Sequence, residues 1–276
     1  MNKIIGVSSF YRVFQRLKIK SREMNMKSIV IMALGVLLML ASLFAQTKRH
    51  VLIYTKNEKG EGMYIHDNID ASVKALQHIC DRHGATYDVS EDASLYTGEN
   101  LRKYDAIIFT NTNNKAFDTP AQRDAFQKYI QGGGGFMGIH SACASERDWP
   151  WFWAMLGGTF VRHPKFQKFD IKVIDRAHPS TRHLDLVWHW EDECYLMNHL
   201  NPDIKVLLAA DLTTIEDDKL AEFPSDIFGT LFPLAWYHEF DGGREFYTAL
   251  GHQIEHYSDP NLVKHLEGGL LWILDK

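Results

Sequence analysis

The sequence predicts an α/β fold, in which a doubly wound, mostly parallel sheet carries helices on both of its faces. Short apolar runs, typical of strands buried on both sides, alternate with segments of helical period through the first half of the chain. Most of these apolar runs end at polar residues or glycines, as strands do where they enter loops. Alternation of this kind favours βαβ units, whose strands are parallel.

The first half of the chain contains four predicted strands and two predicted helices. The strands are His50–Thr55, Thr86–Val89, Tyr104–Thr110 and Phe136–Ile139. The first helix, 65–83, has apolar residues at helical spacing and ends at Gly84, a residue suited to the position after a helix. The second helix, 119–131, begins at Asp118, Thr119 and Pro120, which combine a capping side chain with an early proline.

The second half of the chain is richer in strands. Predicted strands cover Phe169–Ile174, Val187–Met197, Ile204–Ala209, Leu231–Phe240 and Glu245–Leu250. The last two are joined by Asp241, Gly242 and Gly243, a tight-turn signal that predicts a hairpin. An aromatic segment, 149–160, is compatible with a helix or a loop, and a C-terminal helix, 261–274, follows Pro260. Without internal repeats or linkers, this part of the chain is interpreted as one domain of about 230 residues.

Residues 1–45 are interpreted as an N-terminal extension with a signal peptide, outside the α/β domain at 46–276. An apolar run, Ile29–Phe44, follows Lys27 and precedes small and polar residues, so we expect cleavage after Ala45 and a periplasmic or secreted protein. The run is shorter than the ~20 residues that span a membrane, and an uncleaved anchor is the alternative. The signal itself is expected to start at Met24 or Met26.

Charge and cysteine content exclude several classes of protein. After residue 45 the chain holds 23 basic and 34 acidic residues, a net charge of about −11, which argues against nucleic acid as a partner. No membrane association is expected beyond the export signal. The three cysteines, Cys80, Cys143 and Cys194, are too widely spaced for a disulfide framework or a C-x-x-C zinc motif. The oligomeric state is left open, a homo-oligomer included.

The glycine-rich stretch 132–142 is the main clue to function. Four glycines, Gly132–Gly135, lead into a buried strand that is followed at once by His140 and Ser141. In a parallel sheet this position lies at the ligand-binding edge, and a sharp strand-to-helix turn pushes its side chain into the cleft. The stretch is not a P-loop, because no Gly-Lys-Ser/Thr follows the glycines. Cys143 is interpreted as a small packing residue rather than as a nucleophile.

Histidines and carboxylates recur where predicted strands end. Because such ends converge on one edge of the sheet, several of these side chains are expected to share a cleft. A histidine pKa near neutral suits acid–base chemistry, and histidines with carboxylates suit a metal. A divalent metal is therefore left open as a cofactor, with four candidate ligands: His66, His140, His163 and His252. A lone histidine is more often a packing or surface residue, and neither His-Glu-x-x-His nor His-x-His occurs.

Six tryptophans form a second group of candidates: Trp149, Trp151, Trp153, Trp188, Trp190 and Trp236. An indole packs well against the C–H face of a sugar ring while its N–H donates a hydrogen bond. Packing in the hydrophobic core accounts for each tryptophan equally well.

Several motifs, taken in their order along the chain, resemble the ThuA-like (trehalose-utilisation) family over roughly residues 50–274. They are Tyr64-Ile65-His66, GGGFMGIHSA at 133–142, DWPW at 148–151, GGTF at 157–160, HPKFQ at 163–167, His178-Pro179, DECY at 192–195, PLAW at 233–236 and LGH at 250–252. The chain departs from the family pattern at Ile65, where arginine is usual, and at 143–145, where CAS replaces a Thr-Asp-like segment.

The resemblance implies a flavodoxin-like α/β domain of the class I glutamine amidotransferase-like superfamily. It also implies a role in carbohydrate catabolism, often beside oxidoreductases that make 3-keto-glycosides. Relatives in the wider fold carry a Cys-His-Glu triad; by position, His140 stands in place of the cysteine and His252 matches the triad histidine. Because the cysteine nucleophile is missing, glutamine hydrolysis is rejected.

We therefore expect an exported protein that acts on a sugar or a 3-keto-glycoside, as a hydrolase, lyase or isomerase. The expected catalytic residues are His140, His252, Asp192 and Glu193. The expected substrate-binding residues are His66, Ser141, Trp149, Trp151, His163, Gln167, Tyr195 and Trp236. The alternative is a non-catalytic carbohydrate-binding or accessory protein, since function depends on the site and not on the fold.

Overall fold

A nine-stranded sheet is the centre of the computed structural model, which describes residues 48–61, 63–219 and 229–275. Across the sheet the strands lie in the order β2 (Thr86–Ser90), β1 (His50–Tyr54), β3 (Ala106–Thr110), β4 (Gly135–Ile139), β11 (Gly243–Thr248), β10 (Leu231–Phe240), β9 (Lys205–Asp211), β6 (Gln167–Val173) and β7 (Val187–Asp192). A second sheet pairs β5 (Thr159–Arg162) with β8 (Leu196–Asn198). The predicted signal peptide lies outside the described residues and stays a prediction. Within the described residues, no helix has the length and apolar character needed to cross a membrane.

Most strands of the large sheet share one direction. From β2 to β11 each neighbouring pair is parallel, whereas every pair from β11 to β7 is antiparallel. Among the described strands of this sheet, β10 and β6 therefore run against the others, and the predicted mostly parallel sheet is confirmed. The carboxyl ends of β1, β4, β11 and β7 consequently point to the same edge, where sheets of this kind bind ligands.

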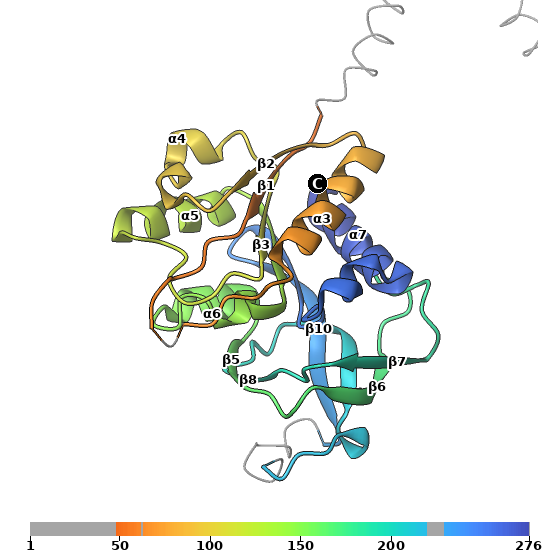
Figure 1. Ribbon diagram of the computed structural model, residues 1–276. Helices are drawn as coiled ribbons and strands as arrows, with labels where there is room; N and C mark the ends of the chain where they lie inside the picture. The colour runs from red at the N-terminus through yellow and green to blue at the C-terminus, as the bar shows by residue number, and fades with distance from the viewer. Residues whose placement is uncertain (1–47, 62, 220–228, 276) are drawn as a thin grey trace, which may run out of the picture. The chain divides into compact units, whose positions relative to one another are not determined.

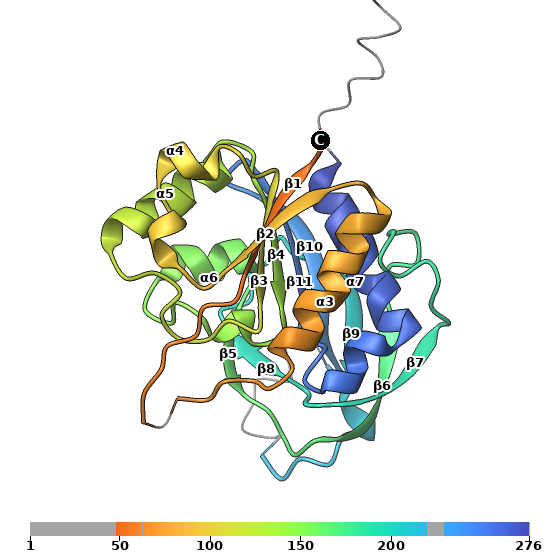
Figure 2. The same cartoon turned by 45° about the horizontal axis from the view of Figure 1, so that its top comes forward.

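Helices cover both faces of the sheet, as a doubly wound fold requires. Helices α3 (Ile69–Arg82) and α7 (Pro260–Leu274) pack together on one face, and α5 (Pro120–Gln131) and α6 (Pro150–Leu156) lie on the other (Figures 1 and 2). The short helix α4 (Gly98–Leu101) packs against α5. Short 3₁₀ segments join these elements: η1 (Ala93–Leu95), η2 (His140–Ala144), η3 (Leu212–Thr214) and η5 (Ile254–Ser258).

Helices α5 and α7 begin where the local sequence signals predict. The Thr119 hydroxyl accepts a hydrogen bond from the Gln122 amide at 3.4 Å, and the Gln122 side chain accepts one from the Thr119 amide at 3.1 Å. Asp259 caps α7 and accepts from the amide of Asn261 at 2.8 Å. A proline follows each cap, at a position where the helix needs no N–H donor.

Helix α3 begins later than predicted, at Ile69 rather than at Ile65. The side chain of Asn68 donates to the backbone oxygens of Gly251 at 2.7 Å and His252 at 2.6 Å, which ties this end of the helix to the loop after β11. The preceding residues therefore form a loop instead of a helical turn. This loop carries His66 to the edge of the sheet.

The single strand predicted over 187–197 is two strands, β7 and β8, separated by three residues. The break follows Asp192, whose carboxylate accepts a hydrogen bond from the Glu193 backbone amide at 2.8 Å. A carboxylate that binds the amide of the next residue competes with the strand's hydrogen-bond pattern. The chain thus leaves the sheet at Glu193 and turns toward the loop after β11.

The glycine run before β4 serves packing and chain reversal. Gly133 has a φ of +87°, a conformation that L side chains rarely adopt. A Cβ atom at Gly135 would lie 2.8 Å from the backbone oxygen of Ile273 in α7. The glycines therefore bring the helix on each face close to the start of β4.

Candidate functional site

The turn after β4 places His140 at the carboxyl edge of the sheet. His140 has a φ of +52°, in the left-handed region that costs energy for a residue with a side chain. Its backbone oxygen accepts a hydrogen bond from the Tyr247 hydroxyl at 2.8 Å, which helps to hold this conformation. Beneath the turn, a Cβ atom at Gly138 would lie 2.7 Å from Leu156, so the strand packs tightly against α6. The structure agrees with the predicted sharp turn and fully buries the His140 side chain.

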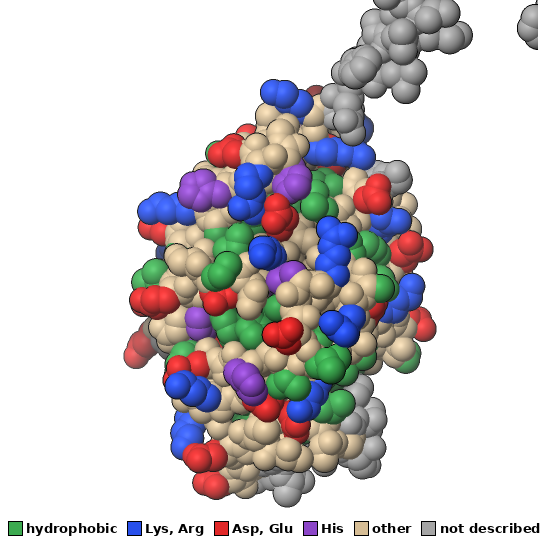
Figure 3. All heavy atoms as spheres, turned by 90° about the vertical axis from the view of Figure 1, so that its right-hand side faces the viewer, with side chains coloured by type: hydrophobic (Ala, Val, Ile, Leu, Met, Phe, Trp, Pro, Cys, Tyr) green, Lys and Arg blue, Asp and Glu red, His purple; other side chains and the backbone are tan. Residues whose placement is uncertain are grey.

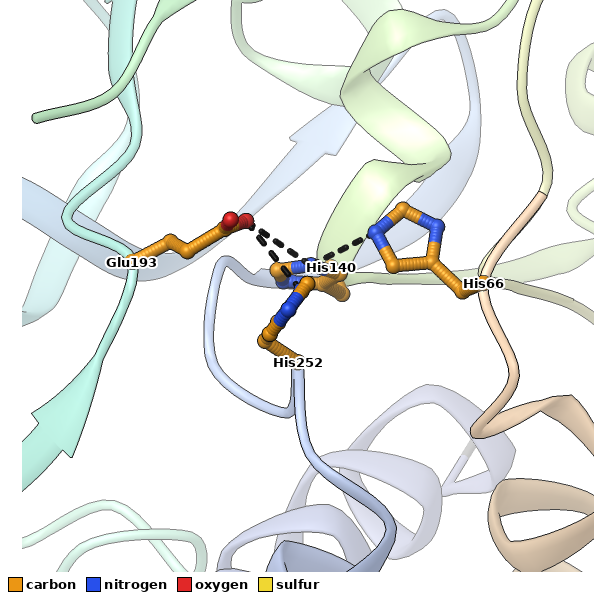
Figure 4. Close-up of side chains that lie close together, drawn as sticks. All are labelled: His66, His140, Glu193 and His252. Carbon is orange, nitrogen blue, oxygen red and sulfur yellow. Dashed lines mark hydrogen bonds and ion pairs between the residues drawn. The ribbon is translucent and has the colours of Figure 1, made fainter. Parts of the chain in front are cut away.

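Four of the predicted site residues converge at this edge, each from a different loop. His66 precedes α3, His140 follows β4, Glu193 follows β7 and His252 follows β11 (Figure 4). One ligand atom from each residue can be chosen so that all four atoms lie within 4.8 Å of one another. The direction shared by these strands is what brings the loops together.

The contacts within this His66–His140–Glu193–His252 cluster are short. His140 Nε2 lies 3.1 Å from His66 Nε2 and 3.8 Å from Glu193 Oε2. Glu193 Oε2 lies 3.2 Å from His252 Nδ1. The cluster is therefore a small set of nitrogen and oxygen atoms that face a common centre.

The ring orientation of His140 is fixed by its neighbours. Its Nδ1 donates a hydrogen bond to the backbone oxygen of Ala249 at 2.7 Å, so in the neutral ring Nε2 carries the lone pair. The Tyr195 hydroxyl lies 2.9 Å from this Nε2 and donates to it. Tyr195, predicted to bind substrate, thus belongs to the site through His140.

Burial controls the charge of the cluster. It lowers the pKa of His66 to about 3, helped by the neighbouring His252 and His163, and lowers the pKa of His140 well below its usual value. Both rings are therefore neutral at neutral pH. Burial also raises the pKa of Glu193, although His163 and His252 oppose the shift. A carboxylate with a raised pKa is a stronger base than one in water.

His163 and Ser141 lie at the boundary of the cluster. His163 Nε2 is 3.5 Å from the second oxygen of Glu193, while its Nδ1 donates to the Pro164 backbone oxygen at 2.8 Å. Its side chain is 35% exposed, compared with 12% for Glu193. The Ser141 hydroxyl lies 3.3 Å from His66 Nδ1 and orients that ring. Both residues, which were predicted to bind substrate, therefore lie beside the cluster.

Asp192, predicted to be catalytic, lies beside the cluster and holds its loops in place. Its side chain is fully buried and accepts hydrogen bonds from Trp190 Nε1 at 2.9 Å, the Gly251 amide at 2.9 Å and the Glu193 amide at 2.8 Å. His256 Nδ1 lies 3.4 Å from the same carboxylate. Because its oxygens bind these donors, Asp192 positions the loops that carry Glu193 and His252.

Asn68 contributes to the site, although the sequence interpretation missed it. It is fully buried, and its side-chain amide binds the backbone of the 251–252 loop from the side of α3. Asp192 binds the same loop through the Gly251 amide. An asparagine just before a helix is a capping signal, but that signal does not reveal a partner far along the chain.

Aromatic side chains flank the cluster, and they are not the predicted tryptophans. Tyr64, which is 57% exposed, lies with its ring 4.7 Å from that of His66, and Phe166, 38% exposed, lies 6.0 Å from that of His252. Nearby, a groove of about 750 Å³ is lined by Trp190 and His256 among others. That volume falls within the range typical of small-molecule sites.

The structure does not bring Trp151 and Trp236 to the cluster. Trp236 is fully buried, and its indole N–H donates to the Leu156 backbone oxygen at 2.8 Å. Trp151 Nε1 donates at 3.1 Å to Asp241, which lies in the β10–β11 turn at the opposite edge of the sheet. Trp149 stacks on Trp151, with ring centroids 5.1 Å apart. These three tryptophans pack around α6.

Gln167 and Cys143 also serve packing or loop contacts. The Gln167 side chain donates to the backbone oxygens of Lys165 and Glu216 and accepts from the Glu216 amide at 2.8 Å. It therefore fastens two loops together beyond the cluster. The Cys143 thiol is buried against the His140 backbone oxygen, and burial raises its pKa to about 12. A thiol with that pKa is protonated at neutral pH, which fits a packing role.

Comparisons with known proteins agree with this architecture. The family model for ThuA, trehalose utilisation, matches residues 50–273. A ThuA-like protein from Bacteroides uniformis is 25% identical, with a TM-score of 0.65 over 83% of this chain and 93% of its own. A ThuA-like protein from Parabacteroides merdae is 18% identical, with a TM-score of 0.64 over 83% of this chain and 91% of its own.

A cytoplasmic protein from Salmonella typhimurium shares the fold, with 12% identity and a TM-score of 0.56 over 81% of this chain and 98% of its own. No curated protein matches the sequence significantly. The family match extends from β1 into α7 and includes every strand of the sheet that carries the cluster. The chain therefore belongs to the ThuA family of trehalose utilisation.

Proposed function

We propose that this protein is an exported enzyme that acts on a sugar or a 3-keto-glycoside by removing a proton next to a carbonyl group. The observation that carries the proposal is the convergence of His66, His140, Glu193 and His252 in one largely buried cluster. The family's link to trehalose utilisation supports a glycoside as the substrate class. Groups whose pKa values are shifted by burial and that gather at a ligand-binding edge are typical of catalytic sites, which favours an enzyme over a non-catalytic binding protein.

Glu193 is the best placed base in the cluster. Its carboxylate lies 3.2 Å from His252, and burial raises its pKa, so it accepts a proton more readily than an exposed carboxylate. In a 3-keto sugar the proton on C2 is acidic because the electron pair left behind is shared with the carbonyl oxygen. The Tyr195 hydroxyl, 2.9 Å from His140 Nε2, is the donor proposed to turn to the resulting enolate and stabilise it.

The first step leaves three outcomes open. Return of the proton to the other face of C2 gives an isomerase. Loss of the glycosidic oxygen from C1, with the proton that Glu193 took from C2 passed to that oxygen, gives a lyase. Addition of water to the eliminated product gives net hydrolysis. All three begin with transfer of the C2 proton, so that transfer is the step to measure.

The surface supports a small-molecule substrate rather than a nucleic acid. On the face drawn in Figure 3, basic and acidic side chains are interspersed, and no stripe of one sign runs across it. A nucleic-acid site would concentrate lysine and arginine along one path. The exposed aromatic rings of Tyr64 and Phe166 beside the cluster are suited to the apolar faces of a sugar.

The test is exchange of the C2 proton with deuterated water, followed by NMR on a panel of glycosides and their 3-keto forms. We expect exchange or product with the full-length protein, and a loss of at least ~100-fold in Glu193→Gln, because the amide is not a base. His140→Asn removes the ring while keeping a residue type that tolerates a positive φ. His83→Gln, a histidine at the far end of α3 paired with Glu267, is the matched control and is expected to be fully active.

Two results would contradict the proposal. Saturable binding of a sugar without exchange or product would identify a binding protein instead of an enzyme. Full activity in Glu193→Gln would move the chemistry away from the cluster. Export is tested separately: cell fractionation and mass spectrometry of the mature N-terminus are expected to show a periplasmic or secreted chain that begins at Gln46.

A further inference from the structure

We infer that the cluster is a binding site for one divalent transition-metal ion, held by His66, His140, His252 and the Glu193 carboxylate. The inference rests on the proposed function in placing the chemistry at these residues: Glu193 Oε2 would hold the ion, and the second oxygen, Oε1, would remain to take the C2 proton. Metal binding is nevertheless measured without any substrate, so each idea can fail while the other stands. Four separate observations carry it: the spacing of the atoms, their unmet bonding needs, the way each side chain is held, and the type of donor.

The spacing of the donor atoms matches a tetrahedral site. Metal–nitrogen and metal–oxygen bonds of about 2.0–2.1 Å at a tetrahedral angle place neighbouring donors about 3.3 Å apart. Three of the six donor pairs are separated by 3.1, 3.2 and 3.8 Å, and all six lie within 4.8 Å. These distances lie on both sides of the expected value. An ion at the common centre would therefore need only small side-chain movements.

The hydrogen-bonding capacity of the cluster is not fully satisfied. His140 Nε2 has a single lone pair, yet His66 Nε2, the Tyr195 hydroxyl and the Glu193 carboxylate all approach it. His252 Nδ1 is buried and lacks an aligned hydrogen-bond partner, despite its short distance to Glu193. Buried polar atoms without partners are costly, and each one requires an explanation. A shared cation satisfies several of them at once.

Second contacts hold the rings of His66 and His140 from behind and hold the backbone beside Glu193 and His252. His140 is fixed through Nδ1 by the Ala249 oxygen, and His66 Nδ1 lies 3.3 Å from the Ser141 hydroxyl. Asp192 orients the backbone on either side of the site through the Glu193 and Gly251 amides. Metal-binding histidines usually make such a contact through their other ring nitrogen. The His66 and His140 rings are thus oriented before any ion binds, and an ion at His140 Nε2 would displace the Tyr195 hydroxyl.

Three imidazole nitrogens and one carboxylate oxygen select the class of metal. Imidazole suits Zn²⁺, Fe²⁺, Ni²⁺ and Cu²⁺, whereas Mg²⁺ and Ca²⁺ prefer oxygen donors. The site takes its ligands from four loops, and the exposed rings of Tyr64 and Phe166 lie beside His66 and His252. A substrate oxygen could add to the ion from that side. There the ion would polarise a carbonyl as a Lewis acid.

Zn²⁺ is the probe for the test, and Co²⁺ is its spectroscopic substitute. The full-length protein is stripped with a chelator and titrated with Zn²⁺ against a chromophoric competitor. We expect one equivalent to bind, and the Co²⁺ form to show the visible absorption bands of a site with four or five ligands. His252→Ala is the main variant, because His252 is partly exposed and its loss is not expected to unfold the chain.

The controls separate the ligands from nearby histidines. Loss of a direct ligand is expected to weaken Zn²⁺ binding by more than ~100-fold, since loss of a mere supporting contact already costs 10–100-fold. His163→Ala, which removes an outer contact to Glu193, is expected to weaken binding by no more than that 10–100-fold, and His83→Ala, at the far end of α3, is expected to leave binding unchanged. Urea unfolding of each metal-free variant shows whether it is folded. Zn²⁺ is also expected to raise the melting temperature of the parent protein but not of His252→Ala.

The outcomes are distinct. The inference is overturned if the parent protein binds no Zn²⁺ or Co²⁺, or if His252→Ala binds them equally well. Turnover that survives complete metal removal would also overturn a metal role in the reaction and would leave the proposed function intact. One equivalent of Zn²⁺, lost in His252→Ala, supports the inference even if no substrate is turned over.

Discussion

Replacement of Asp192 by asparagine separates a catalytic role from a positioning role. The sequence placed Asp192 beside Glu193 as a catalytic candidate, but the structure surrounds its carboxylate with three N–H donors. An asparagine has the same shape but only one acceptor oxygen. If that oxygen faces Trp190 and Gly251, the Glu193 amide loses its partner; in the other orientation, two donors lose theirs.

The cost follows from the hydrogen bonds. Loss of one bond to a buried charged group costs about 1.5–3 kcal/mol, so Asp192→Asn is expected to lower the free energy of unfolding by about that amount. Asp192→Ala leaves all three donors unpaired and is expected to cost more than ~4 kcal/mol. Since Glu193 loses the contact that orients its backbone, turnover and Zn²⁺ affinity are expected to fall by 10–100-fold in Asp192→Asn.

The assay is urea unfolding, with Zn²⁺ affinity and turnover measured on the same preparations. Glu193→Gln provides the opposite pattern: little change in stability, because its side chain lacks such backbone donors, and loss of activity of at least ~100-fold. The reasoning is refuted if Asp192→Asn keeps the parent stability but abolishes turnover. That result would make Asp192 the base.

The remaining predictions concern packing, substrate contacts and pH. Gly138→Ala places a Cβ atom 2.7 Å from Leu156 and is expected to cost about 1–3 kcal/mol in urea unfolding; an unchanged stability would show that the turn is loosely packed. Phe166→Ala is expected to raise KM at least threefold, whereas Trp151→Phe leaves KM unchanged, and equal effects would contradict the placement of the sugar. Burial lowers the pKa of His265 to about 3, so below about pH 6.5 the unfolded chain binds a proton that the folded chain excludes. His265 is thus expected to contribute a fall in stability of ~1.4 kcal/mol per pH unit as pH drops from 6.5 toward 3, and His265→Phe to reduce the measured slope by that amount in urea titrations at each pH.

Much of the fold could be predicted from the sequence, because the signals that define single elements are local. The capping residues of α5, the hairpin turn before β11 and the apolar run of β4 each depend on a few neighbouring residues. Local signals do not predict the start of α3, because a contact between Asn68 and the 251–252 loop decides it. Local signals also do not predict the end of β7, where a hydrogen bond of Asp192 interrupts the strand predicted over 187–197.

The residues of the site were likewise only partly predictable from the sequence. The chain by itself determined that His140 sits on a sharp turn at the ligand-binding edge, because strand, glycines and turn are contiguous. The sequence offered candidates for the other site residues, but it could not select the correct ones from 14 histidines and several tryptophans. Only the tertiary structure decided that Glu193 faces His140 while Asp192 turns away, since adjacent residues at a strand end point in different directions. It alone placed Trp151 at the far edge and Phe166 beside His252, because the distance between loops depends on how the whole sheet is wound, and no local stretch of sequence records that.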